Sequence, residues 1–166
     1  VEARAQLPGV EHAGDGEVLV VEADALADHI GLLEHALGKF AGENIVEGLK
    51  AQGKTEANVI SITGSAGTTM VSERQRGFLE AMAAAPEYKV VETQATAWDP
   101  VESGRIAQQL FAKYAGQGGI QAVRADADYM AIPIIEAARQ AGLKIGGADG
   151  LIVSGSTCTP EGIAAI

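Results

Sequence analysis

Four side chains of the sequence could act together, as a cation, an aromatic ring and two carboxylates: Arg74, Trp98, Asp126 and Asp149. The C–H-rich face of a sugar stacks on an aromatic ring, and sugar hydroxyls pair with charged donors and acceptors. These residue types are therefore typical of a sugar site, provided that the fold brings them together. An alternative for Trp98, the one tryptophan of the chain, is a lid over the start of the next helix.

The residues around Arg74 predict a strand, a turn and a helix in succession. Asn58–Thr63 is a β-branched run that indicates a buried strand, Gly64–Gly67 supplies the turn, and Thr68 or Thr69 can cap a helix. Arg74 borders the buried face of that helix, near the end where the helix dipole disfavours a cation. Such an arginine needs an acceptor, either on a ligand or, as the alternative, in water reached past the edge of the core.

Trp98, Asp126 and Asp149 follow later strand-like runs in the same way. The residues Asp99-Pro-Val-Glu102 predict the start of one following helix, and Asp128 is expected to cap the next, which leaves Asp126 freer to face a ligand. The strands are expected at 88–96, 119–125 and 143–148, and the helices at about 99–115 and 128–141.

Strands that alternate with helices at these spacings predict an α/β fold, with a three-layer, Rossmann-like arrangement of a mostly parallel sheet and helices on both faces. In such a sheet, ligands bind beyond the carboxyl ends of the strands. We therefore expect Arg74, Trp98 and Asp149 to line one crevice at that edge, with Asp126 nearby. The strands expected as parallel neighbours are Asn58–Thr63, Val90–Thr96, Ile120–Ala125 and Lys144–Gly147.

The chain before these units is less regular. Val1–Gly16 has no clear period, Glu17–Glu22 predicts a short apolar strand, and Ala23–Gly31 predicts a polar connection. A helix is expected from His35, with Gly53 as its stop. The residues expected on the buried face of this helix are Leu37, Phe40, Ala41, Ile45 and Leu49.

Composition narrows the class of protein. With 47% hydrophobic and 20% charged residues, the 166 residues suffice for one globular domain with a substantial core. The formal net charge of −10 argues against nucleic acid or an anionic membrane surface as a partner, because both attract basic surfaces. Cys158 stands alone, so no internal disulfide is expected, and no apolar run approaches transmembrane length. A last helix is expected to begin at Thr159-Pro160.

Motifs for catalysis or metal binding are weak. The turn at 64–69 lacks the lysine of a P-loop and the third glycine of a dinucleotide fingerprint. His12, His29 and His35 match no metal-site spacing, and Ser154-Gly-Ser156 has no histidine placed to activate a serine. We therefore expect a binding protein rather than an enzyme, with no metal or cofactor.

A set of short stretches carries a family resemblance through its order and spacing. The stretches are His29-Ile-Gly, Leu37-Gly-Lys-Phe-Ala-Gly42, Gly64-Ser-Ala-Gly-Thr-Thr69 with Glu73-Arg74 and Gly77-Phe78, Trp98-Asp99, Ala122-Val123 with Asp128-Tyr-Met-Ala131, and Ala148-Asp-Gly150. From about residue 29 to residue 166 the chain resembles the ribose-binding-protein branch of the type I periplasmic binding proteins. In that family two Rossmann-like lobes close over a sugar, and the receptor delivers it to an ABC importer.

The resemblance implies roles for particular residues. Arg74 falls where the family places its sugar-binding arginine, and Trp98 falls at the aromatic residue that stacks on the sugar. Asp149 falls at the aspartate that accepts from sugar hydroxyls. Ala127 stands where the family often has a ligand-binding asparagine, which makes Asp126 a candidate substitute.

The resemblance also implies a division of the chain and a function. Residues 1–53 would be an irregular lead-in with a strand and a helix from the tail of the first lobe, and residues 54–166 would be the second lobe, truncated at its end. Leu33-Glu34 replaces the usual Asp-Asn after the first-lobe strand. The implied function is a monosaccharide or polyol receptor that works with an ABC transporter permease, either in the periplasm or outside the cell and tethered to a membrane. The alternatives are the effector-binding core of a LacI-type regulator and an enzyme with a phosphate site at Gly64–Thr69.

Overall fold

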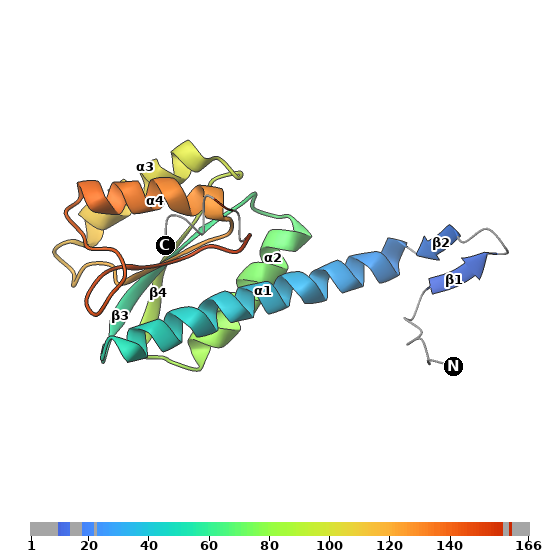
Figure 1. Ribbon diagram of the computed structural model, residues 1–166, viewed down its shortest axis with the longest axis horizontal. Coiled ribbons are helices and arrows are strands. Elements are labelled where there is room, and N and C mark those ends of the chain that lie inside the picture. Colours follow the sequence, from blue (N-terminus) through green and yellow to red (C-terminus); the bar gives the residue numbers. More distant parts are fainter. Residues whose placement is uncertain (1–9, 14–17, 22, 158–159, 161–166) are drawn as a thin grey trace.

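A four-stranded parallel sheet organises the part of the chain that the computed structural model describes, which is residues 10–13, 18–21, 23–157 and 160 (Figure 1). The strand order is β4-β3-β5-β6, and each neighbouring pair is parallel. The α/β fold class expected from the sequence is confirmed. The strands are β3 (Ala57–Thr63), β4 (Tyr88–Ala95), β5 (Ala122–Ala125) and β6 (Ile152–Ser154).

Helices cover both faces of this sheet, so that the described residues form three layers (Figure 1). Side chains on successive strand positions point to opposite faces. Val59 and Ala122 therefore join the core beneath α1 and α2, while Ile60 and Val123 join the core beneath α3 and α4. The helices are α1 (Ala23–Ala51), α2 (Thr69–Ala83), α3 (Pro100–Tyr114) and α4 (Asp128–Gln140).

The helix starts expected for α2 and α3 are confirmed. The Thr68 hydroxyl accepts a hydrogen bond from the backbone N–H of Val71 at 3.4 Å and so caps α2. The Asp99 carboxylate accepts from the backbone N–H groups of Val101 and Glu102 at 2.8 and 3.1 Å, with proline at the first helical position of α3. Both caps fix the residue at which the helix begins, and so fix the turns that follow β3 and β4 at the carboxyl edge of the sheet.

The first helix is longer than expected. The segment 23–31, expected as a polar connection, forms the first turns of α1, because its three alanines and Leu26 favour a helix. The expected stop is confirmed, since Gly53 adopts a positive φ of 69° just after α1. Of the residues expected on the buried face, Ala41, Ile45 and Leu49 are buried, whereas Leu37 and Phe40 are 40% and 62% exposed.

The fourth strand of the sheet lies later in the chain than expected. Gly146 and Gly147 both adopt positive φ, at 63° and 69°, and so bend the segment that was expected as a strand at 144–147. Only an isolated bridge joins Ile145 to Leu151 there, within the described residues. The chain enters the sheet instead as β6, which pairs with β5 in parallel.

Near its beginning the chain forms an antiparallel hairpin that projects away from the sheet (Figure 1). The strand expected at 17–22 is observed as β2 (Val18–Val21), and its partner β1 (Val10–Ala13) falls in a segment that was expected to be irregular. Cys158 and the cap expected at Thr159 lie outside the described residues.

Candidate ligand-binding site

The carboxyl ends of β3 and β5 are tied together by the carboxylate of Asp126. Its Oδ2 accepts a hydrogen bond from the backbone N–H of Gly64, which begins the turn after β3, at 2.9 Å. Its Oδ1 forms an ion pair with Arg124. The sequence suggested that Asp126 faces a ligand in the crevice. Both of its carboxylate oxygens are instead engaged within the protein and the residue is fully buried, so Asp126 organises this edge.

Arg74 reaches the same edge from α2 and finds acceptors within the protein. Its NH1 group donates to the backbone oxygen of Asp126 at 2.6 Å, and its Nε donates to Oε2 of Glu34 on α1 at 2.6 Å. Arg74 is buried, at 5% exposure, so the alternative of a side chain that extends past the core into water is wrong. The guanidinium is held by two fixed acceptors at the rim of the candidate site.

Arg124 is a residue of this network that the sequence analysis missed. It lies on β5 beside Ser61 of β3, and its NH1 group donates to the Ser61 hydroxyl at 3.0 Å and to Oε1 of Gln75 at 2.6 Å. The guanidinium also lies 4.9 Å from the centre of the Phe78 ring. Burial lowers the pKa of Arg124 from its ordinary value, and the carboxylate of Asp126 opposes that shift. A charged residue at an inward-facing position of a short apolar strand was the available signal.

Trp98 lies over Gly64 at the same edge. An ideal Cβ added at Gly64 would come within 2.2 Å of Cε2 of the indole, so only glycine permits this contact. Ala97 and Trp98 both adopt positive φ, at 51° and 68°, a conformation that residues other than glycine rarely adopt. The ring is partly buried against the core beneath α3 and α4, which leaves some of its surface open. Strained backbone that aims an aromatic ring at the ligand edge of an α/β sheet is typical of a binding site.

Asp149 lies at the opposite edge of the sheet from the other three candidates. It precedes β6, and its neighbours Gly147 and Gly150 accept hydrogen bonds at 2.8 and 2.9 Å from the side chain of Gln52, which follows α1 and precedes β3. Asp149 is exposed and pairs with Lys144 at 2.8 Å, and this hydrogen bond lowers the pKa of Asp149 from its ordinary value. The expectation that Asp149 shares a crevice with Arg74 and Trp98 is therefore wrong, because the strand it was thought to follow begins after it.

Thr157 occupies the place at the carboxyl edge that was expected for Asp149. Its backbone N–H donates to Oδ1 of Asp128 at 3.1 Å, and its hydroxyl accepts from the backbone N–H of Asp128 at 3.1 Å. Asp128 is thus the first residue of α4 rather than its N-cap, which is Ala127. The sequence did contain a signal, because Ile152-Val-Ser followed by Gly155 repeats the pattern of an apolar strand followed by glycine seen at β3.

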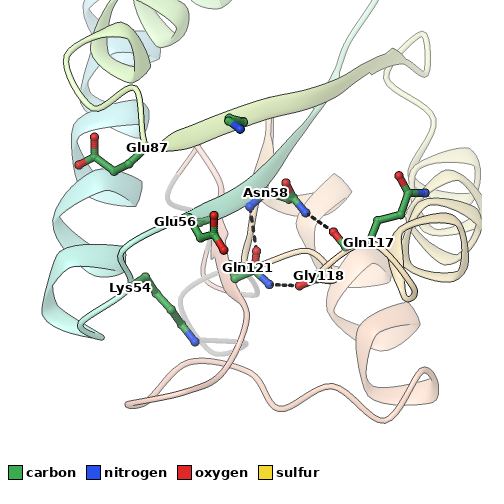
Figure 2. A pocket seen from close by; sticks show the side chains of 9 residues that line it. Lys54, Glu56, Asn58, Glu87, Gln117, Gly118 and Gln121 are labelled. Carbon is green, nitrogen blue, oxygen red and sulfur yellow. Dashed lines mark hydrogen bonds between the residues drawn. The ribbon is translucent and has the colours of Figure 1, made fainter.

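A polar cavity of about 260 Å³ lies at the amino edge of the sheet, away from Arg74 and Trp98 (Figure 2). Its polar side chains largely satisfy one another. The side-chain amide of Asn58 donates to the backbone oxygen of Gln117 at 3.0 Å, and its backbone N–H donates to Oε1 of Gln121 at 2.8 Å. The side-chain amide of Gln121 donates to the backbone oxygen of Gly118 at 2.7 Å. The described residues contain no cluster of three His, Cys, Asp or Glu residues that could hold a metal ion.

Comparisons with known proteins identify the family to which the chain belongs. The model of the periplasmic binding protein domain matches residues 1–166. The ribose import binding protein of Haemophilus influenzae is 29% identical over 141 residues, which cover 85% of this chain and 44% of that protein. The galactofuranose-binding protein of Escherichia coli is 33% identical over 110 residues, which cover 66% of this chain and 33% of that protein.

A solved structure of a myo-inositol binding protein is also similar to this chain. The Caulobacter myo-inositol binding protein bound to myo-inositol matches with a TM-score of 0.69 and 25% sequence identity, over 79% of this chain and 42% of that chain. The present chain spans less than half the length of each of these three relatives. Among the described residues, no helix combines the length and the apolar character needed to cross a membrane. The chain belongs to the periplasmic binding protein family.

Proposed function

We propose that the chain forms most of the second lobe, together with a tail of the first lobe, of a receptor that binds a monosaccharide or polyol for an ABC importer. The observation that supports this most directly is the carboxyl edge of the sheet, where Asp126 holds both Arg74 and Gly64, and the Trp98 ring lies over Gly64. The relatives named above bind ribose, galactofuranose and myo-inositol, and the chain shares their family. A receptor of this kind acts in the periplasm, or outside the cell on a tether, and hands its ligand to a membrane permease.

In this proposal each residue at the edge has a separate task. Trp98 supplies the apolar ring on which a sugar face stacks, and Arg74 supplies N–H donors for hydroxyl oxygens. Asp126 and Arg124 hold these groups in place without touching the ligand, and Thr157 adds a hydroxyl at the end of β6. Because a binding site needs fixed donors more than it needs a nucleophile, the arrangement suits binding rather than catalysis.

The division of the chain is part of the same proposal. Residues 54–166 would belong to the second lobe, and residues 1–53 would come from the tail of the first lobe. The second half of α1, which carries Ile45 and Leu49, packs with Val59 and Phe78 into one core. That packing would join the two parts where the chain passes from one lobe to the other.

Calorimetric titration of the whole protein with monosaccharides, polyols and nucleotides tests the proposed function. We expect a sugar or polyol to bind, and we expect Trp98→Ala and Arg74→Ala each to weaken that binding by about 1–3 kcal/mol, since each removes one contact surface. The matched control is Leu79→Ala in the second half of α2, a side chain that is 44% exposed, which should leave binding unchanged. Binding of nucleotides alone, or sugar binding that both substitutions leave intact, would contradict the proposal.

A further inference from the structure

Glu34 is an acidic residue on α1 that reaches into the site proposed above. Its Oε2 accepts the hydrogen bond from Nε of Arg74 at 2.6 Å, and the NH2 group of Arg74 forms an ion pair with the same oxygen. The Arg74 and Glu34 side chains are only 6% and 15% exposed. A ligand that approaches this guanidinium therefore meets the Glu34 carboxylate as well.

The position of Glu34 is fixed by close packing of α1 on α2. A Cβ added at Gly38 would lie 1.8 Å from the backbone oxygen of Arg74, and one added at Gly77 would lie 2.0 Å from the backbone oxygen of His35. The two helix backbones are thus in direct contact beside Glu34 and Arg74. These backbone contacts fix the positions from which the Glu34 and Arg74 side chains extend toward each other.

Charge is unevenly distributed at this edge of the sheet. Two guanidiniums, those of Arg74 and Arg124, lie at this edge together with the carboxylates of Glu34, Asp126, Asp128 and Asp99. Arg124 pairs with Asp126, Arg74 pairs with Glu34, and Asp128 accepts a hydrogen bond from a backbone N–H. Carboxylates therefore outnumber guanidiniums at this edge, and Glu34 is the carboxylate that pairs directly with Arg74.

We propose that Glu34 is a specificity-determining residue, which admits neutral hydroxylated ligands to Arg74 and excludes anionic ones. This inference rests on the proposed function. A ligand carboxylate or phosphate would lie beside Glu34 in a largely desolvated place, where repulsion between like charges is stronger than in water. A hydroxyl has no such conflict, because it donates to a carboxylate oxygen and accepts from a guanidinium N–H.

The test compares matched pairs of ligands in the whole protein by isothermal titration calorimetry. Each pair consists of a neutral monosaccharide and its uronic acid, or of a monosaccharide and its phosphate ester. Glu34→Gln removes the charge and keeps the shape, and Glu47→Gln, at an exposed position of the same helix, is the matched control. We expect the ratio of anionic to neutral association constants to rise at least about tenfold in Glu34→Gln and to stay unchanged in Glu47→Gln.

The ratio also separates this inference from the function on which it rests. Partial misfolding of a variant lowers both association constants together and leaves their ratio unchanged, so far-UV circular dichroism of each variant accompanies the titrations. An unchanged ratio in a folded Glu34→Gln variant overturns the role of Glu34, while binding of the neutral sugar still supports the proposed function. A wild-type protein that prefers the anionic member of a pair also overturns it. If the wild-type protein binds no member of any pair, the proposed function itself fails, and the inference fails with it.

Discussion

Arg124 and Asp126 form an ion pair in which both side chains are closed to solvent. Taking two charges out of water is costly, and the attraction between them offsets this cost only when further hydrogen bonds complete the site. Here Arg124 also donates to Ser61 and Gln75, and Asp126 accepts from Gly64. The pair therefore links β5 to β3 and to α2 at the place where Arg74 is held.

We expect Arg124→Met to lower the free energy of unfolding by about 3–5 kcal/mol, because it leaves the Asp126 carboxylate buried without its cation. Adding Asp126→Asn should restore part of this loss, since an amide carries no charge and its oxygen still accepts from the Gly64 N–H. Urea unfolding of the two variants measures both values. A double variant that is no more stable than the single variant would show that the unpaired charge is not the cause.

A second prediction for a single residue concerns the contact of Gly64 with Trp98. Gly64→Ala places a methyl group within 2.2 Å of the Trp98 ring, so the ring must move or the turn must shift, at a cost of about 1–3 kcal/mol in unfolding free energy. Sugar binding should weaken as well, because the stacking surface is displaced. Gly116→Ala is the control, since an added Cβ there meets no atom within 4 Å. Equal thermal stability of the two variants would contradict the close contact.

At the scale of elements, the contact between α1 and α2 depends on glycines. Gly38→Ala and Gly48→Ala both gain about 1 kcal/mol of helix propensity. The new methyl group at 38 meets the backbone of α2 at 1.8 Å, whereas the one at 48 meets the end of the Ile152 side chain at 2.8 Å, which can turn aside. We therefore expect Gly38→Ala to be the less stable variant by about 1–3 kcal/mol in urea unfolding. The reverse order would show that α1 is free to move away from α2.

The elements also show what the sequence could predict and what it could not. Local signals were sufficient for α3, because Asp99, Pro100 and Glu102 specify a helix start by themselves. They were not sufficient for β6, since Lys144–Gly147 has the composition of a strand and its exclusion from the sheet depends on two glycines with positive φ. Because the strand begins after Asp149 and not before it, Asp149 lies at the amino edge of the sheet and not at the carboxyl edge.

Tertiary contacts account for the rest of the difference. The partners of Arg74 could not be predicted, because Glu34 is 40 residues away along the chain and Asp126 contributes a backbone oxygen rather than its carboxylate. Arg124 was missed for the same reason, since two of its partners lie on β3 and α2, 63 and 49 residues away along the chain. Residue type and spacing identified the edge of the sheet that matters, but only the packing of α1, α2 and the sheet decides which charges there are already paired.

At the scale of the whole molecule, the proposed receptor binds by closing two lobes over its ligand. One lobe supplies roughly half of the contacts, while a bound sugar loses its translational and rotational freedom in either case. We therefore expect the 166-residue chain to bind the ligand far more weakly than the two-lobed protein, for example with a dissociation constant that rises from about 1 μM to about 1 mM. Parallel calorimetry on both proteins measures this, and equal affinities would place the whole site within this chain.

The contact between Trp98 and Gly64 has an optical consequence. Because the chain has one tryptophan, its indole fluorescence arises from a single known position, and the protein carries its own reporter without a label. A ligand that stacks on the open part of the ring replaces water there, which shifts the emission toward shorter wavelengths. Titrations of the 166-residue chain can therefore be followed by its emission wavelength, and we expect a molecule that binds in the cavity at the amino edge to leave that wavelength unchanged.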